Sequence, residues 1–93
     1  MEFEWDPKKA AANLKKHGVS FLEAMEAFAD ESAIDELDPA HSFNQEYRFA
    51  LIGLSSRRLL FVSFTMPDES TIRLISARKA NRAQERFYKH AKN

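Results

Sequence analysis

The sequence predicts an α+β domain with two N-terminal helices, an antiparallel sheet of three to four strands and a C-terminal helix. Three observations predict this fold class. Two helix-start signals lie within the first 23 residues, three runs rich in apolar and aromatic residues follow with short turns between them, and a capping pair precedes the last segment. The 93 residues fit one domain, taken as 1–93, and 44% of them are hydrophobic, which is enough for one core.

A short strand and then a helix are predicted first. Phe3 and Trp5 alternate with acidic residues, a pattern typical of a strand. Asp6 can accept hydrogen bonds from the free N–H groups of a first helical turn, and Pro7 suits the first helical position. Gly18 is expected to end this helix in a left-handed conformation, after basic residues that complement the negative end of the helix dipole.

Two further helix starts are predicted from capping pairs. Ser20 and Glu23 form a capping box, so a second helix should begin there. Asn81 with Gln84 three residues later should cap the C-terminal helix in the same way. In the second helix, apolar residues at i, i+3, i+4 and i+7, counted from Phe21, form one stripe that is assigned to the core: Phe21, Ala24, Met25 and Phe28.

Three strands are predicted over residues 47–54, 59–65 and 71–78. The turns between them, residues 55–57 and 66–69, are short enough to join only antiparallel neighbours. The middle strand begins with four consecutive apolar residues, so it should be central and covered by helices on at least one side.

A weak fourth strand is predicted over residues 33–36. Asp38-Pro39 should break it and open a polar loop over residues 38–45. His41 lies in that predicted loop, where Asp38 either orients its imidazole or simply forms a turn with it.

Composition excludes several classes of protein. With no cysteine the chain has no disulfide, thiolate chemistry or cysteine zinc site, and its three histidines show no metal-ligand spacing, so neither a metal nor another cofactor is expected. No run approaches the roughly 18 apolar residues of a membrane span. The acidic and then polar N-terminus does not resemble a signal peptide, so a soluble cytoplasmic domain without a membrane partner is expected.

The formal net charge of zero hides a strong separation of charge along the chain. Residues 19–46 hold eight Asp or Glu and no Lys or Arg, whereas residues 73–93 hold seven Lys or Arg and one Glu. A basic end suits a polyanion, and an acidic middle suits a basic partner. The alternative is that both runs are ordinary solvated surface.

Three blocks of residues, spread over nearly the whole chain, identify a family. The first is FEWDP at residues 3–7 with Lys9, Asn13 and KHGVSF at residues 16–21; the second is DPAHS at residues 38–42 with Glu46, Arg48, Ile52 and Gly53; the third is IRLISAR at residues 72–78 with Ala80, Glu85 and Arg86. In this order the blocks resemble the BrnT toxins, whose fold is similar to that of the RelE-type ribonucleases.

The resemblance implies an RNA endonuclease that needs no cofactor and blocks translation. It also implies a cognate, BrnA-like antitoxin that neutralises the toxin and binds DNA. The pair would repress its own promoter, so the chain would meet promoter DNA only through the antitoxin.

Cleavage of RNA without a metal needs a base for the 2′-hydroxyl proton, cations for the phosphorane and an acid for the leaving 5′-oxygen. His17 is the first acid or base candidate, because on a helical wheel it borders a polar arc with Lys9, Asn13 and Lys16. The alternative is that His17 only caps the C-terminus of the helix. His90, near the C-terminus, is expected to be merely solvated.

Arginine suits the phosphate, because its planar guanidinium donates two parallel hydrogen bonds. In a regular strand Arg73 would share one face with Ile75 and Ala77, and Arg78 the other, so Arg78 at the strand end is preferred as the phosphate clamp. Glu46 and Arg48 share a strand face and are either a structural ion pair or a base beside a phosphate clamp.

The candidates for catalysis are therefore His17, Lys16, Glu46, Arg48 and Arg78, and those for RNA binding are Arg73, Lys79, Arg82, Arg86 and Lys9. Four aromatic residues that are also able to stack on bases are assigned to the core: Phe3, Trp5, Phe61 and Phe64.

Two other classes compete with the ribonuclease. A nucleic-acid-binding module without catalysis explains the basic end equally well, but it gives no reason for a histidine beside lysines. A protein-binding subunit would use the acidic stretch as its contact surface. Incubation with total RNA separates the three, through cleavage, retention without cleavage, or neither.

Overall fold

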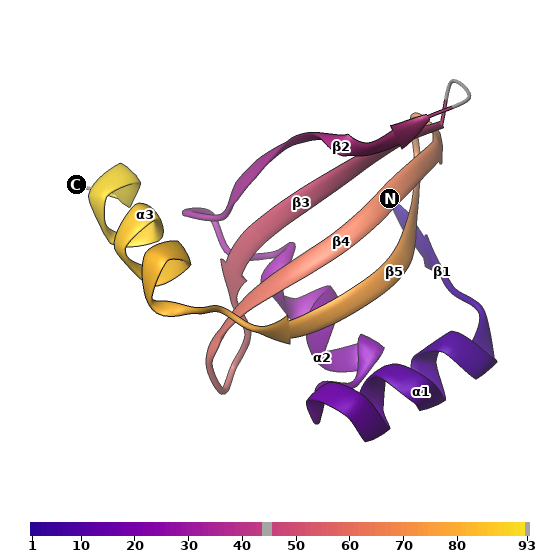
Figure 1. Ribbon diagram of the computed structural model, residues 1–93, viewed down its shortest axis with the longest axis horizontal. Helices are drawn as coiled ribbons and strands as arrows, with labels where there is room; N and C mark the ends of the chain where they lie inside the picture. The colour runs from indigo at the N-terminus through magenta and orange to yellow at the C-terminus, as the bar shows by residue number, and fades with distance from the viewer. Residues whose placement is uncertain (44–45, 93) are drawn as a thin grey trace.

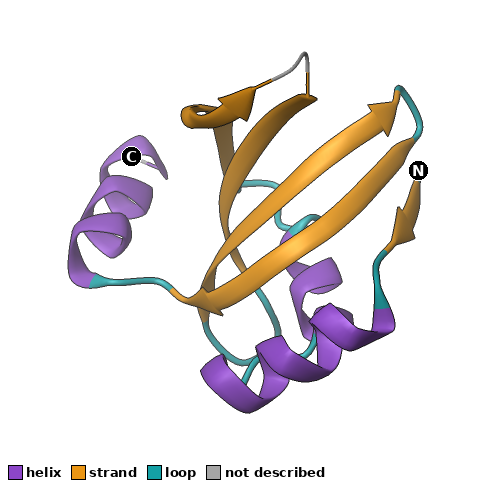
Figure 2. Cartoon of the chain, turned by 45° about the vertical axis from the view of Figure 1, so that its right-hand side comes forward, coloured by secondary structure: helices purple, strands orange, loops and turns teal. Residues whose placement is uncertain are grey.

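Five strands form a single mixed sheet, with three helices around it (Figure 1). The computed structural model describes residues 1–43 and 46–92. The elements are β1 (Glu2–Glu4), α1 (Pro7–His17), α2 (Phe21–Ala27), β2 (Ile34–Phe43), β3 (Glu46–Leu54), β4 (Leu59–Asp68), β5 (Thr71–Lys79) and α3 (Arg82–Lys92). The strand order is β1-β5-β4-β3-β2. In Figure 2, α1 and α2 lie together against the sheet, and α3 stands apart from them at one end.

The prediction of an antiparallel sheet of three to four strands is wrong in two respects. β1 pairs with β5 in parallel, which makes the sheet mixed. β2 continues to Phe43 through the segment predicted as a loop. Pro39 is tolerated there because β2 is an edge strand, and its pairing with β3 is interrupted between Asp38 and Phe43. Residues 44–45 of the predicted loop lie outside the described residues.

The local signals for helix ends are confirmed in most respects. The Asp6 carboxylate accepts a hydrogen bond from the Lys8 N–H at 2.8 Å, and Gly18 ends α1 with a φ of 70°. Asn81 and Gln84 form a complete capping box, each side-chain oxygen accepting from the other residue's backbone N–H, at 2.8 and 2.9 Å.

The core lies between β3–β5 and the two helices α1 and α2, and β4 is central as predicted. Leu60 and Val62 of β4 are fully buried in it, together with Ala24 of α2. The fit is close at Gly53, where an added Cβ would stand 2.6 Å from the carbonyl oxygen of Ala27. Among residues 1–43 and 46–92, no helix is long and apolar enough to cross a membrane.

Asn13 joins α1 to the sheet, although the helical wheel placed it in a polar arc. Its amide nitrogen donates to the carbonyl oxygens of Ala77 and Val19 at 2.8 and 2.9 Å, and its oxygen accepts from the Ala77 N–H at 3.0 Å. β1 accompanies β5 only from Thr71 to Arg73, so the backbone of Ala77 has no strand partner on that side. The buried amide takes the place of that missing strand.

Glu23 supplies only half of the predicted capping box. Its backbone N–H donates to the Ser20 hydroxyl at 3.0 Å, but its carboxylate binds the β3–β4 turn instead of the Ser20 N–H. The Arg58 guanidinium donates to both carboxylate oxygens at 2.8 and 3.0 Å, and the Ser55 hydroxyl donates at 2.8 Å. These hydrogen bonds, that from Arg58 above all, hold the pKa of Glu23 below its ordinary value.

Replacing Arg58 with alanine should lower the free energy of unfolding at pH 7 by about 3 kcal/mol, because it leaves a carboxylate that is 7% exposed without its cation. The folded-state pKa of Glu23 is depressed, so the wild-type contribution is full above the ordinary pKa of 4.5 and is lost as pH falls through the folded value. Urea unfolding at neutral and acidic pH should therefore show the difference between variant and wild type shrinking in acid.

Arg57 provides the matched control, because it is 71% exposed and its guanidinium is 4.0 Å from the Glu23 carboxylate. Arg57→Ala should change the free energy of unfolding by less than about 1 kcal/mol. Equal losses for the Arg57 and Arg58 variants would contradict the assignment.

Candidate functional site

The face of the sheet that α1 and α2 leave uncovered carries three of the predicted site residues, Arg48, Arg73 and Arg78. We call it the open face. A β-bulge in β5 decides which side chains reach it: Ser63 pairs with Ser76, but the next residue of β4, Phe64, pairs with Leu74, so Ile75 is the extra residue. Leu74 and Ala77 consequently both face the core.

The parity prediction for β5 is therefore wrong. A regular strand would place Arg73 and Arg78 on opposite faces, whereas the bulge shifts the alternation by one residue and puts both on the open face with Ser76. Arg73 is exposed and forms an ion pair with Glu4 of β1, its cross-strand neighbour. Its charge is thus partly neutralised in the free protein.

Arg78 is half-buried and held in one orientation. Its guanidinium lies over the ring of Phe61 at 4.6 Å from the ring centroid and donates to Gln84 Oε1 and the Lys79 carbonyl oxygen at 3.4 and 3.3 Å. Phe61 was assigned to the core, but it lies on the open face as the partner of Arg78 in the sheet. Phe3, Trp5 and Phe64 do pack in or against the core.

His17, Lys16 and Lys9 come together at the outer edge of β5. With Ser76 and Ile75 they line a pocket of about 240 Å³. His17 is half-buried at the last position of α1, and among the described residues none forms a hydrogen bond with its imidazole. Ser76 adjoins both candidates, because it lines this pocket with His17 and stands two residues from Arg78 on the same face of β5.

Arg48 lies on the open face, but at the other end of the strands. It pairs with Thr65, which in turn pairs with Arg73. Arg78 pairs with Phe61, which pairs with Ile52 of β3, four residues after Arg48. Four residues correspond to about 13 Å along the strand. The structure therefore separates Arg48 from Arg78 and His17.

Arg48 Nε and the hydroxyl oxygen of its neighbour Thr65 are buried, and neither forms a hydrogen bond with a described residue. Thr65 is 3% exposed and was not singled out in the sequence, where nothing distinguishes it from other strand residues. Glu46 begins β3 opposite Phe43, but its side chain, like that of His41, lies outside the described part of the chain.

The remaining basic candidates surround α3. Lys79 ends β5, and Arg82 and Arg86 lie one turn apart on α3; all three are exposed. Among the side chains that the structure describes, which exclude those of His41 and Glu46, no group of three or more His, Asp or Glu could hold a metal ion.

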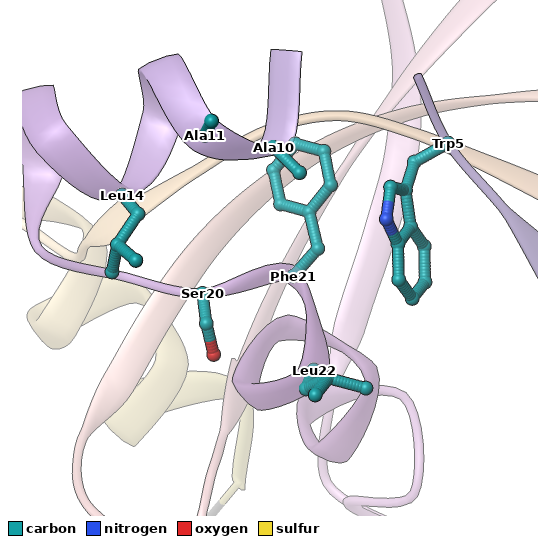
Figure 3. A pocket seen from close by; sticks show the side chains of 7 residues that line it. All are labelled: Trp5, Ala10, Ala11, Leu14, Ser20, Phe21 and Leu22. Atoms are coloured by element: carbon teal, nitrogen blue, oxygen red, sulfur yellow. The ribbon is translucent and has the colours of Figure 1, made fainter. Parts of the chain in front are cut away.

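A second hollow, of about 230 Å³, is apolar, unlike the pocket beside His17. Figure 3 shows it between α1 and α2, lined almost entirely by apolar side chains, among them Trp5, Leu14 and Leu22. Its α1 residues are on the flank of the helix opposite Lys9 and Lys16. It offers no group for proton transfer or phosphate binding.

The chain belongs to a family of small ribonuclease toxins. The family model described as "Ribonuclease toxin, BrnT, of type II toxin-antitoxin system" matches residues 5–84. Among solved structures, the chain is similar to the ribonuclease toxin BrnT of Brucella abortus, with 25% sequence identity and a TM-score of 0.65. The alignment covers 88% of this chain and 99% of that one. A comparison with curated proteins gave no significant match.

The family predicted from the three sequence blocks is thereby confirmed. The chain is a ribonuclease toxin of a type II toxin–antitoxin system, which also implies a cognate antitoxin.

Proposed function

We propose that the chain cleaves RNA on the open face of the sheet without a metal ion, uses the 2′-hydroxyl as nucleophile, and thereby blocks translation. One observation carries the proposal: Ser76 adjoins both a histidine whose imidazole is free of hydrogen bonds to described residues and an arginine fixed on the same strand. A phosphate above Ser76 would lie between a proton-transfer group and a cation.

One of the two proton transfers and the stabilisation of charge on phosphorus then each have a residue. His17 exchanges a proton with the 2′-hydroxyl or the 5′-oxygen, since imidazole can hold or release a proton near neutral pH. Arg78, with Lys16 beside His17, stabilises the charge that develops on phosphorus. The 2′-oxygen bonds to phosphorus, the bond from phosphorus to the 5′-oxygen breaks, and a 2′,3′-cyclic phosphate remains.

Glu46 and Arg48 take supporting roles in this proposal. In this proposal Arg48, which is separated from Arg78 along the strands, holds a neighbouring phosphate of the same RNA chain. Glu46 is proposed on its sequence position alone, two residues before Arg48 on β3.

Cleavage should be unaffected by EDTA, and the products should end in a 2′,3′-cyclic phosphate or a 3′-phosphate. The inventory of His17, Lys16 and Arg78 favours proton transfer with phosphate clamping. An RNA that carries a single 2′-deoxynucleotide at the cleaved position should be inert, and the same RNA with the 2′-deoxynucleotide elsewhere should be cut normally. Activity that disappears in EDTA and returns with magnesium would refute the mechanism.

The basic residues around α3 should bind the RNA backbone. Arg82→Ala/Arg86→Ala should weaken RNA binding and reduce the slope of log affinity against log salt concentration by about one to two, because fewer counterions are released. Fluorescence anisotropy with an uncleavable RNA measures this slope. Lys8→Ala/Lys15→Ala, which removes the same charge from the α1 flank beside the apolar hollow, should leave the slope unchanged. Equal slopes in all three proteins would exclude a contact at α3.

We further propose that the fold is of the RelE type and that the cognate antitoxin is a BrnA-like, DNA-binding protein. The three sequence blocks and the family membership support both. Expression of the chain alone should arrest growth, and co-expression of the neighbouring gene should relieve the arrest. Normal growth with folded protein present would refute the toxin's proposed action in the cell.

A further inference from the structure

A third hollow, of about 370 Å³, lies between α3 and the open face. It is lined by Glu36, Ile52, Phe61, Asn81, Ala83, Gln84 and Phe87. Its volume falls within the ~300–1,000 Å³ of small-molecule sites. Phe61, which forms one wall, is the residue on which the Arg78 guanidinium rests. A base in this hollow would therefore be next to the proposed phosphate clamp.

We propose that this hollow is a base-recognition site that selects guanine in the RNA substrate. The inference rests on the proposed cleavage of RNA on the open face and adds the nucleotide that is read there. Three features carry it: two aromatic walls, a free carboxylate, and two amide groups whose orientation is fixed.

The aromatic walls come from different layers of the fold. Phe61 belongs to the sheet, and Phe87 projects from the second turn of α3. Phe87 is 50% exposed and does not belong to the core cluster, so burial does not account for it. Aromatic side chains that stand free beside a cationic surface are the usual stacking partners of unpaired RNA bases.

The carboxylate belongs to Glu36 on β2. Its backbone pairs with Ala50, which places the side chain on the open face, and its carboxylate forms no hydrogen bond or ion pair with any side chain or backbone group that the structure describes. An ionised carboxylate only accepts hydrogen bonds, and its two oxygens can accept a parallel pair.

The amides belong to Asn81 and Gln84. The capping box uses both of their oxygens, because Asn81 Oδ1 accepts from the Gln84 N–H, and Gln84 Oε1 accepts from the Asn81 N–H and from Arg78. Their NH₂ groups consequently remain as donors. The hollow thus combines one double acceptor with two donors.

Guanine is the base that matches this pattern. Its N1–H and 2-amino group are adjacent donors, suited to the two oxygens of Glu36, and its O6 and N7 are acceptors, suited to the amides. Adenine would turn its N1 lone pair toward the carboxylate. Uracil has a single N–H flanked by two carbonyl oxygens, and cytosine places an acceptor beside its amino group.

The test uses short RNAs of one sequence in which a single nucleotide is guanosine, inosine, adenosine, cytidine or uridine. Cleavage beside guanosine should be about 10-fold faster or more than beside the other natural bases, the scale of one good two-hydrogen-bond contact to a base. Inosine, which lacks the 2-amino group, should lose much of this advantage. Anisotropy with the same RNAs, made uncleavable by a 2′-deoxynucleotide, reports binding independently of catalysis.

Three variants locate the contact. Glu36→Gln should remove most of the preference for guanosine, and Phe87→Ala should weaken binding of all five RNAs by about 10-fold while keeping their order. Asp35→Asn, the matched control, removes the neighbouring charge from the opposite face of β2 and should change nothing. Both Glu36 and Phe87 are exposed, and thermal unfolding verifies that the variants fold.

Equal cleavage beside all bases, or a preference that Glu36→Gln leaves intact, would overturn the guanine site while the ribonuclease mechanism stands. If no RNA is cleaved, the proposed mechanism fails, and the anisotropy series still decides the site. Tighter binding of the guanosine RNA that depends on Glu36 would support it, and indifference to the base would overturn it.

Discussion

Replacing Arg78 with alanine should lower the rate of RNA cleavage by about 100-fold or more, and His17→Ala should do the same. The Arg78 guanidinium is held over Phe61 on the open face, and in the proposed mechanism it stabilises charge that develops only in the transition state. In the same mechanism His17 moves a proton in that step. Single-turnover cleavage of a defined RNA, at saturating enzyme, measures both losses as changes in the chemical step rather than in binding.

The controls separate chemistry from charge and from folding. His90→Ala, near the exposed end of α3, should retain full activity. Arg78→Lys should recover only part of the rate, because an ammonium lacks the planar pair of donors. Circular dichroism and thermal unfolding should show that the variants are folded. A fully active His17→Ala would mean that the imidazole only caps α1 and that another group transfers the proton.

Replacing Asn13 with alanine should lower the free energy of unfolding by about 3 kcal/mol. The change leaves the N–H and carbonyl of Ala77 and the carbonyl of Val19 without their side-chain partner, and each buried, unsatisfied group costs about 1–3 kcal/mol. Urea unfolding at pH 7 measures the loss.

Asn13→Asp is the sharper comparison for the same contact. A carboxylate keeps the size of the side chain and the acceptor for the Ala77 N–H, but it sets negative oxygens against two carbonyl oxygens, so it should destabilise at least as much as alanine. Lys9→Ala, one turn earlier on the exposed side of α1, should cost less than about 0.5 kcal/mol. An Asn13→Ala variant as stable as wild type would show that the amide does not hold α1 to β5.

The clustering of candidate site residues could be predicted from the sequence where those residues are close together in the chain. Lys16 and His17 are neighbours, and Lys9 is two turns earlier on the same helix, so helical geometry alone predicted that they would gather. The catalytic roles of these residues stay predictions, as do those of Glu46, Arg48 and Arg78. The hollow beside α3 had no sequence signal, because Glu36 and Phe87 are 51 positions apart in the chain and meet only in the folded molecule.

The sequence by itself determined the features that depend on neighbouring residues: the caps at Asp6, Gly18 and Asn81, the strands β3 to β5, and the family. A cap or a turn is specified by interactions within a few residues, so its signal is contained in a short segment. The charge runs and the absence of cysteine are likewise properties of the chain itself.

Only the tertiary structure decided how the segments register against one another. The bulge at Ile75 brought Arg73 and Arg78 to one face, β1 joined the sheet in parallel, and the Glu23 carboxylate bound Arg58 instead of closing its own capping box. Each of these outcomes depends on the balance of packing and hydrogen bonds between segments that are distant in sequence. A one-residue shift in pairing changes which face every later side chain occupies, and no local pattern in β5 announces that shift.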